Sequence, residues 1–405
     1  MEGSEHPGRT SSASFDQRPA PTSEPNTMRG WGRGSLRNFL GNCLIYRNVS
    51  PCDPRLPGLS EVRQRLGIAD VRIPRKNEDG YAVVVAELLR IARSFDAPSA
   101  PIRYLLYLGD TRLSDGTAFA NLCRVTGWSG MAFIGAERQG PPSLEQNQGG
   151  PAAIYTGGRW DAVFAFAELA AKVGMGVDEH TAVVIDIDKT AIGARGRNDR
   201  VIDRARVDAV RTTVSDLLGD SFCAPEFLAA YERLNTAEFH PFTADNQDYL
   251  AYICLVLGSG LVTLDDLVSD IQGGSLQSFD QFIHAVDARS ALMSAALAGI
   301  HHQILDLVKE GDPTPFKAFR RNEYLATVHH MSASDDAMDT ALLLRDKIVI
   351  THEVRQVAEL WQGRGALLFG LSDKPDEAAL PTPDLAARGY QPLHHVEAHM
   401  VGLTP

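Results

Sequence analysis

The chain has 405 residues, which is enough for two or three domains and a sizeable core. Charged residues make up 22% and hydrophobic residues 44%, as in soluble globular proteins, and the net charge of −12 argues against a nucleic-acid or anionic-membrane partner. Five scattered cysteines without a C-x-x-C pair indicate a reducing compartment and no zinc site. Because no apolar run approaches ~18 residues and no signal-peptide core begins the chain, we expect a cytoplasmic protein.

The first half of the chain divides into a polar leader and the start of an α/β core. Residues 1–34 are rich in Ser, Pro, Gly and Glu and nearly free of aliphatic side chains, which predicts a disordered leader. Residues 35–192 alternate between buried strands and amphipathic helices, and residues 141–150, rich in Pro, Gln and Gly, are expected to form a loop. In this part we expect helices near 83–91, 117–126 and 160–172, and strands at 104–108, 131–135 and 182–185.

One strand of this core ends in two aspartates at alternate positions. The stretch TAVVIDIDKT, residues 181–190, places Asp186 and Asp188 directly after a β-branched apolar run. One carboxylate at such a strand end can attack phosphorus while the next exchanges a proton. Two anions held so close favour a divalent cation, and Mg²⁺ suits carboxylate and carbonyl ligands best. The alternative is a solvated Asp-x-Asp turn without chemistry.

A second strand, at 104–108, also runs into acidic residues, because Gly109 and Asp110 follow it and Asp115 comes shortly after. Ligands collect at the carboxyl ends of parallel strands, so this loop is a candidate metal-binding segment. The structural alternative is a turn followed by a helix N-cap at Gly109 and Asp110.

Residues 193–348 have mainly helical periodicity and no convincing buried strands, which predicts an all-helical insertion. The aromatic and amide-rich stretch 238–249 is a candidate for its substrate-facing surface, and Arg320-Arg321 for a contact with a substrate anion. Adjacent His301 and His302 are expected to point apart on their helix and not to chelate one metal. Helices are expected within residues 201–218, 225–234, 246–257, 279–286, 290–308 and 315–331.

The α/β pattern returns in residues 349–405. A helix over 352–362 and a buried strand over 366–371 lead into Ser372, Asp373 and Lys374. A helix is expected around 376–379, and the tail at 394–402 is a candidate final strand. The predicted fold class is therefore α/β, a Rossmann-like parallel sheet with helices on both faces, interrupted by the large helical insertion.

The three strand ends together resemble the haloacid dehalogenase (HAD) superfamily, most of whose members are phosphatases. The resemblance rests on D-x-D-x-T at residues 186–190, Gly-Asp…Asp at residues 109–115 and Ser372, which are similar to the family's first, fourth and second motifs. The fourth motif precedes the first in this chain, so the resemblance implies a circularly permuted HAD-like core. Residues 193–348 then occupy the place of the family's helical cap. The family's third motif, a lone lysine, is matched by either Lys76 or Lys374.

The resemblance implies a role for each matching residue. Asp186 would attack phosphorus, and Asp188 would protonate the leaving alcohol and then activate water. Ser372 would hydrogen-bond a phosphoryl oxygen, and Lys76 would neutralise charge on the phosphoryl group and the nucleophile. Mg²⁺ would be held by the Asp186 carboxylate, the Asp188 backbone carbonyl and Asp110, with Asp115 as a further ligand or a supporting group.

The function implied by the resemblance is a Mg²⁺-dependent phosphatase that acts on a small phosphorylated metabolite. The acid at Asp188 disfavours dehalogenation, because family members that cleave carbon–halogen bonds lack it. Two alternatives stay open: a phosphotransferase such as a phosphomutase, which passes the phosphoryl group to another substrate, and an inactive HAD-like binding or regulatory protein. The sequence indicates neither the substrate nor the oligomeric state.

Overall fold

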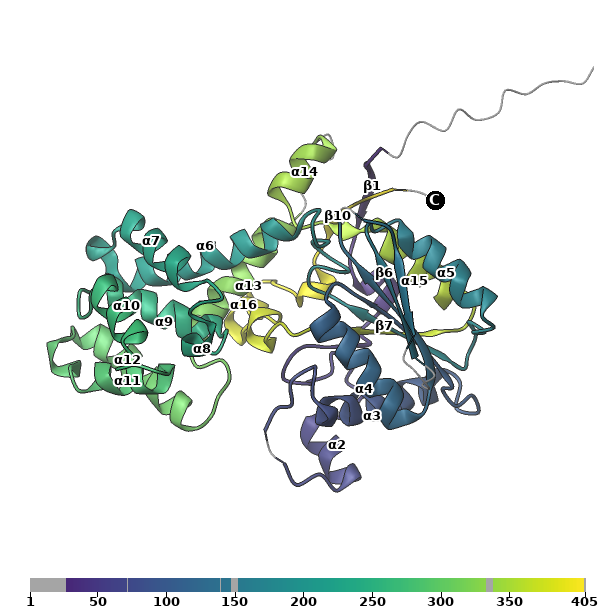
Figure 1. The fold of residues 1–405 in the computed structure, drawn as a ribbon, viewed down its shortest axis with the longest axis horizontal. Helices are drawn as coiled ribbons and strands as arrows, with labels where there is room; N and C mark the ends of the chain where they lie inside the picture. Colours follow the sequence, from purple (N-terminus) through teal and green to yellow (C-terminus); the bar gives the residue numbers. More distant parts are fainter. Residues whose placement is uncertain (1–26, 71, 139, 147–151, 333–337, 404–405) are drawn as a thin grey trace, which may run out of the picture.

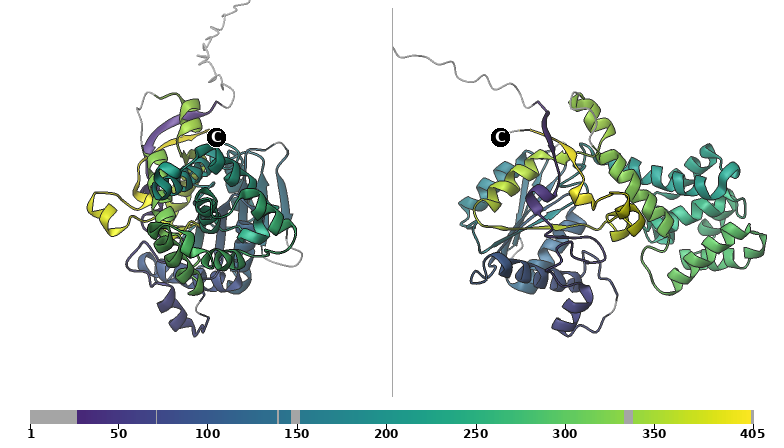
Figure 2. Two further views of the ribbon diagram at one scale, coloured as in Figure 1. Left: turned by 90° about the vertical axis from the view of Figure 1, so that its left-hand side faces the viewer. Right: turned by 180° about the vertical axis from the view of Figure 1, so that it is seen from behind.

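The computed structural model describes residues 27–70, 72–138, 140–146, 152–332 and 338–403. It has two lobes side by side along its longest axis, an α/β body and a helical lobe (Figures 1 and 2). Most of the predicted leader, residues 1–26, lies outside the described residues.

A seven-stranded sheet forms the centre of the α/β body, with strand order β2-β9-β7-β3-β4-β6-β5. All neighbouring strands pair in parallel except β5 and β6, which are antiparallel. The predicted α/β class with a mostly parallel sheet is thus confirmed. The strands are β2 (Leu44–Ile45), β3 (Tyr104–Gly109), β4 (Ser129–Gly135), β5 (Ser143–Gln146), β6 (Ala152–Gly157), β7 (Thr181–Asp186) and β9 (Leu367–Leu371).

Helices cover both faces of the sheet because side chains alternate between the two faces along each strand. On β3, Leu105 and Tyr107 belong to the core shared with α3 (Asp79–Asp96) and α4 (Thr117–Thr126). Leu106 and Leu108 belong to the opposite core, which contains side chains of α5 (Ala162–Lys172) and α15 (His352–Gln362). Figure 1 shows the two pairs of helices on opposite sides of the sheet.

Several predictions for the edges of the α/β body are wrong. Residues 29–34, assigned to the leader, form β1 (Arg29–Gly34), which pairs antiparallel with β10 (Ala398–Gly402). The tail strand therefore joins a separate small sheet, β1-β10-β8, in which β8 is Ile350–Thr351. The predicted loop at 141–150 contains β5, and β6 follows it, so the sheet is mixed rather than parallel at this edge. The partners of these short strands are distant in sequence or polar, so periodicity alone gives little signal.

The helical lobe is inserted between β7 and β8, and the mainly helical expectation for it is confirmed. Four of its helices begin at Asn246, Thr263, Ser278 and Ser294, whose side chains accept a backbone N–H of the first turn. The lobe has a hydrophobic core of its own. Its helices are α6 (Asp199–Leu218), α7 (Ala224–Leu234), α8 (His240–Thr243), α9 (Gln247–Gly258), α10 (Leu264–Gln272), α11 (Phe279–Asp287), α12 (Ala295–Lys309), α13 (Lys317–Met331) and α14 (Thr340–Asp346).

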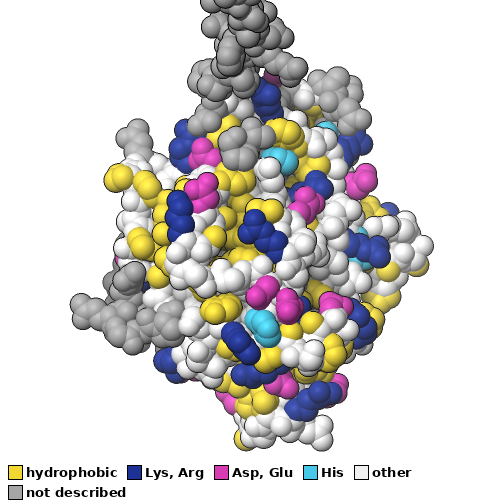
Figure 3. All heavy atoms as spheres, turned by 90° about the vertical axis from the view of Figure 1, so that its right-hand side faces the viewer, with side chains coloured by type: hydrophobic (Ala, Val, Ile, Leu, Met, Phe, Trp, Pro, Cys, Tyr) yellow, Lys and Arg dark blue, Asp and Glu magenta, His cyan; other side chains and the backbone are white. Residues whose placement is uncertain are grey.

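Charge is mixed on the face of the α/β body that points away from the helical lobe. Figure 3 shows basic and acidic side chains interspersed there among hydrophobic ones, without a broad field of one sign. Among the described helices, none combines the length and the apolar character needed to cross a membrane.

A buried ion pair joins the start of the helical insertion to the C-terminal part of the body. The Arg197 guanidinium donates to both oxygens of Glu353, at 3.0 and 2.9 Å, and to Glu137 at 2.7 Å. The Arg197 and Glu353 side chains are only 3% and 0% exposed. Removing one partner of such a pair leaves an uncompensated buried charge.

We therefore expect Arg197→Met to lower the free energy of unfolding by about 3–5 kcal/mol, because Glu353 stays buried without its partner. Arg211→Met is the matched control, since Arg211 is exposed and pairs with Asp208 on its own helix. The control should change stability by less than about 0.5 kcal/mol. Urea unfolding of both variants measures the difference, and equal effects would contradict this account.

Candidate active site

The three strands expected to carry the site are neighbours in the sheet, in the order β9-β7-β3, as predicted. Asp186 pairs in register with Leu371, and Ile185 with Leu108. The residues that follow these strands therefore meet at one edge of the sheet, the usual position of ligand sites in parallel sheets.

The chain turns sharply after β7. The N–H groups of Ala191 and Ile192 donate to the carbonyls of Asp186 and Ile187, five residues back, at 3.2 and 3.0 Å. Lys189, within this turn, has a left-handed φ of 65°. The turn keeps residues 188 and 189 beside Asp186, and both line the cavity described below.

Asp110, Asp115 and Asp186 form a buried acidic cluster. One carboxylate oxygen of each lies within 4.8 Å of the others, well inside the ~10 Å separation beyond which one metal cannot join Asp110 to Asp186. Asp188 is outside this cluster of side chains, in agreement with the expected use of its backbone carbonyl rather than its carboxylate.

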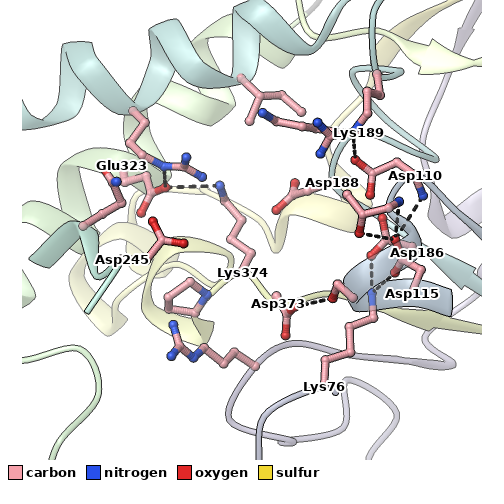
Figure 4. A pocket seen from close by; sticks show the side chains of 18 of the residues that line it. Lys76, Asp110, Asp115, Asp186, Asp188, Lys189, Asp245, Glu323, Asp373 and Lys374 are labelled. Carbon is pink, nitrogen blue, oxygen red and sulfur yellow. Dashed lines mark hydrogen bonds and ion pairs between the residues drawn. The ribbon is translucent and has the colours of Figure 1, made fainter. Parts of the chain in front are cut away.

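Two cations compensate part of the negative charge. Lys76 Nζ donates to Asp115 Oδ1 at 2.7 Å and to Asp186 Oδ1 at 2.5 Å, and the lysine is only 3% exposed. Arg195 forms an ion pair with Asp110. Of the two lysines considered for the third motif, Lys76 is thus the one at the nucleophile, whereas Lys374 Nζ lies 3.5 Å from Glu323 of the helical lobe (Figure 4).

The carboxylates of the cluster have strongly different proton affinities. Burial raises the pKa of Asp186 well above its usual range, and the charge of Asp115 adds to this rise. Burial and Asp115 together also raise the pKa of Asp110 to about 7. Asp115 is buried as well, but Lys76 and the N–H of Thr111 outweigh burial and lower its pKa to about 2. The cluster therefore has more negative charge than its two cations neutralise.

The cluster fits a hard divalent cation. Its donor atoms are all carboxylate oxygens, the ligand type that Mg²⁺ prefers. Asp186 Oδ2 is buried and has no hydrogen-bond partner among the described residues, so it retains an unused acceptor at the cluster. A cation held by Asp110 and Asp186 would satisfy this oxygen and reduce the repulsion between the carboxylates.

Glycine at position 109 makes room for Asp115. A Cβ on Gly109 would lie 2.4 Å from the Asp115 Cβ, closer than real contacts allow. Asp115 Oδ2 also accepts the backbone N–H groups of Asp110 and Thr111, at 3.0 and 2.9 Å. With both oxygens occupied by Lys76 and these donors, Asp115 is better placed to support the cluster than to bind a substrate.

Ser372 is buried, with no exposed surface, and is not among the residues that line the cavity. Its hydroxyl accepts the backbone N–H of Lys374 at 3.0 Å, so it shapes the turn that brings Asp373 and Lys374 to the cavity wall. The expected contact between Ser372 and a phosphoryl oxygen finds no support in this position.

A cavity of about 340 Å³ lies between the acidic cluster and the helical lobe (Figure 4). Three residues of the predicted substrate-facing stretch line it, residues 245–247. Ala244 and Asp245 both have a φ of 51°, a conformation that non-glycine residues adopt at a cost and that occurs mainly at functional sites. Arg320 also lines the cavity, but Asp248 and Glu323 already pair with it, whereas Arg321 pairs with Asp384 at the surface.

The sequence alone did not single out several charged residues of the cavity, namely Arg47, Lys189, Arg195, Arg206, Glu323 and Asp373. Arg195 is 85 positions from Asp110, and Arg206 is 117 positions from Glu323. Only the tertiary fold brings such pairs together, so no local motif indicates them. Lys189 and Asp373 stand next to motif residues, and that adjacency was the one available signal.

A second group of possible metal ligands lies in the helical lobe, and the expectation that His301 and His302 point apart is wrong. Their Nε2 atoms lie 3.1 and 3.7 Å from the same Asp287 oxygen. His301 Nδ1 also lies 2.6 Å from the Tyr252 hydroxyl, so a hydrogen-bonded structural histidine accounts for this group without a metal.

A scan against protein-family models, a search of curated proteins and a search of solved structures each found no match for this chain. The resemblance to the HAD superfamily thus stays an inference from three short motifs. What the site can do has to be judged from its geometry and charge.

We expect millimolar Mg²⁺ to raise the melting temperature of the protein, because a ligand that binds only the folded state stabilises it. The shift should disappear in Asp110→Asn, which removes a charged donor of the cluster. Asp216→Asn, a change at an exposed helical position outside the cluster, should keep the full shift. Thermal unfolding with and without Mg²⁺ measures this, and an unchanged shift in Asp110→Asn would place the cation elsewhere.

Proposed function

We propose that this protein is a Mg²⁺-dependent phosphatase that hydrolyses small phosphoesters through an aspartyl-phosphate on Asp186. One observation carries the proposal: Asp186 ends a central strand at the cavity, with one oxygen bonded to Lys76 and the other without a partner. A buried carboxylate with an uncommitted oxygen is suited to nucleophilic attack. The D-x-D-x-T motif and its resemblance to the HAD superfamily support the same chemistry.

In the first step an oxygen of Asp186 forms a bond to phosphorus, and the bond from phosphorus to the ester oxygen breaks. Asp188 lines the same cavity two residues further on and donates a proton to the departing oxygen. In the second step Asp188 takes a proton from water, which attacks phosphorus and releases inorganic phosphate. Asp186 is then regenerated as a carboxylate.

The cationic groups hold and neutralise the transferred group. Lys76 is fixed between Asp115 and Asp186, so its charge is in place before the substrate arrives. A Mg²⁺ ion held by Asp110, Asp186 and the Asp188 carbonyl would supply further charge neutralisation. The helical lobe supplies one wall of the cavity, and we propose that it acts as a cap whose motion admits the substrate and excludes water.

Turnover of a generic aryl phosphoester, with Mg²⁺ and with a chelator, tests the function. Release of inorganic phosphate that depends on Mg²⁺ supports a phosphatase and rules out an inactive binding protein. Transfer of the phosphoryl group to an added alcohol or sugar without release of phosphate would identify a phosphotransferase instead. No reaction under either condition would overturn the proposal.

The two aspartates should respond differently to amide substitution. Asp186→Asn should abolish turnover, since an amide is a poor nucleophile, whereas Asp188→Asn should lower kcat by about 10²–10⁴ through loss of the acid/base. Asp161→Asn is the control, because this residue lies outside the cavity lining and should leave kcat unchanged. Steady-state kinetics distinguish the variants, and near wild-type rates for Asp186→Asn would refute the assignment.

A further inference from the structure

The cavity has two ends of opposite charge, and the division follows the strands. The acidic end lies at β7 and β3, where four aspartates, at positions 110, 115, 186 and 188, are compensated by Lys76 and Arg195. The neighbouring strands β9 and β2 are followed instead by Lys374 and Arg47, which both line the cavity. These two cationic residues come from adjacent segments, since the Arg47 N–H donates to the Lys374 carbonyl at 3.0 Å.

The helical wall at the basic end has its own carboxylates, but cations already satisfy them. Glu323 pairs with Arg320 at 2.5 Å and with Arg206 at 3.3 Å, and Arg320 also pairs with Asp248. Lys374 is thus a further cation on a carboxylate that already has two, and its contact with Glu323 is long, at 3.5 Å. Lys374 is only 5% exposed, so water compensates its charge poorly.

Arg47 is the second cation without a close counter-charge. It is half-buried, and its guanidinium has no hydrogen bond or ion pair among the described residues. The nearby Asp373 and the cavity residue Asp245 are exposed, so water screens their charges. A half-buried arginine presents a fork of donors that suits a carboxylate or phosphate.

We infer that Arg47 and Lys374 form a subsite for a second anionic group of the substrate, a carboxylate or a second phosphate, at the end of the cavity opposite Asp186. The inference rests on the proposed function, in which Asp186 receives the phosphoryl group. Strands in a sheet are ~4.8 Å apart, so the ends of β2 and β7 lie on the order of 10 Å apart, with β9 between them. The substrate class is therefore a short phosphoester with an acidic group a few bonds from the ester oxygen.

The size and composition of the cavity agree with this class. Its volume of about 340 Å³ is near the lower limit of small-molecule sites. Its lining is dominated by charged and amide side chains, with Ile202 and Pro375 as its aliphatic members. An apolar or bulky leaving group would leave the charges of Arg47 and Lys374 without partners, which disfavours such substrates.

A matched pair of esters tests the subsite: a short aliphatic phosphoester that ends in a carboxylate, and its carboxamide analogue of the same size. We expect the wild-type protein with Mg²⁺ to favour the carboxylate ester by about 10–100-fold in kcat/KM, the range for a hydrogen-bonded charge. Arg47→Gln should remove most of this preference by raising KM for the carboxylate ester, with kcat for the carboxamide ester within about threefold of wild type.

Two further variants distinguish direct binding of the second anion from a contact with the transferred group and from a long-range effect of charge. Lys374→Met should behave like Arg47→Gln if it binds the second anion, whereas a lysine that binds the transferred phosphoryl group would affect both esters equally. Arg321→Gln removes a positive charge from the same region but outside the cavity lining, and it should keep the full preference. Loss of the preference in Arg321→Gln would reveal a long-range charge effect and overturn the subsite.

The outcomes also separate the subsite from the phosphatase proposal. Equal turnover of both esters by the wild type, or equal losses on both in Arg47→Gln, would overturn the subsite and leave the phosphatase intact. If neither ester is turned over, the phosphatase proposal fails, and calorimetry of ester binding to Asp186→Asn decides the subsite. Tighter binding of the carboxylate ester that is lost when Arg47→Gln is added would support the subsite, and equal binding would overturn it.

Discussion

The site depends on one buried lysine held between two strand ends. Lys76 bonds to Asp115 after β3 and to Asp186 at the end of β7, and without it three carboxylates within 4.8 Å of one another would repel strongly. Removing a cation from such a buried cluster leaves uncompensated charges. The same ammonium group thus holds the loops of two strands together and prepares a positive charge beside the nucleophile.

The order of strands in the sheet also explains how one cavity can treat two ends of a ligand differently. Strands β7 and β3 deliver aspartates, whereas β9 and β2 deliver Lys374 and Arg47. The helical lobe completes the cavity with carboxylates that are already paired to arginines, so it adds shape without cancelling the charge of the basic end. Charge at the edge of the sheet thereby separates a reaction centre from a recognition surface.

Sequence reasoning located the parts of the site that follow strands with strong apolar patterns. Asp186 and Asp110 were found in this way, and Lys76 was found because it precedes the helix that leads to β3. Residues that reach the site through tertiary packing, such as Arg195 opposite Asp110, carry no local signal. Ser372 shows the opposite failure, because a motif position at a strand end does not reveal whether the side chain faces the cavity or the interior. The short strands β1 and β5 were missed because their partners are distant or their composition is polar.

The central claim is that Asp186 becomes covalently phosphorylated during turnover. The most direct measurement is acid quenching of the Asp188→Asn variant with a phosphoester and Mg²⁺, followed by mass spectrometry of its peptides. In that variant the nucleophile is intact but the base that activates water is missing, so the intermediate should accumulate. The account predicts a phosphoryl group on the peptide that contains Asp186, absent when Asp186→Asn is added. A phosphoryl group on another residue, or none while turnover continues, would contradict it.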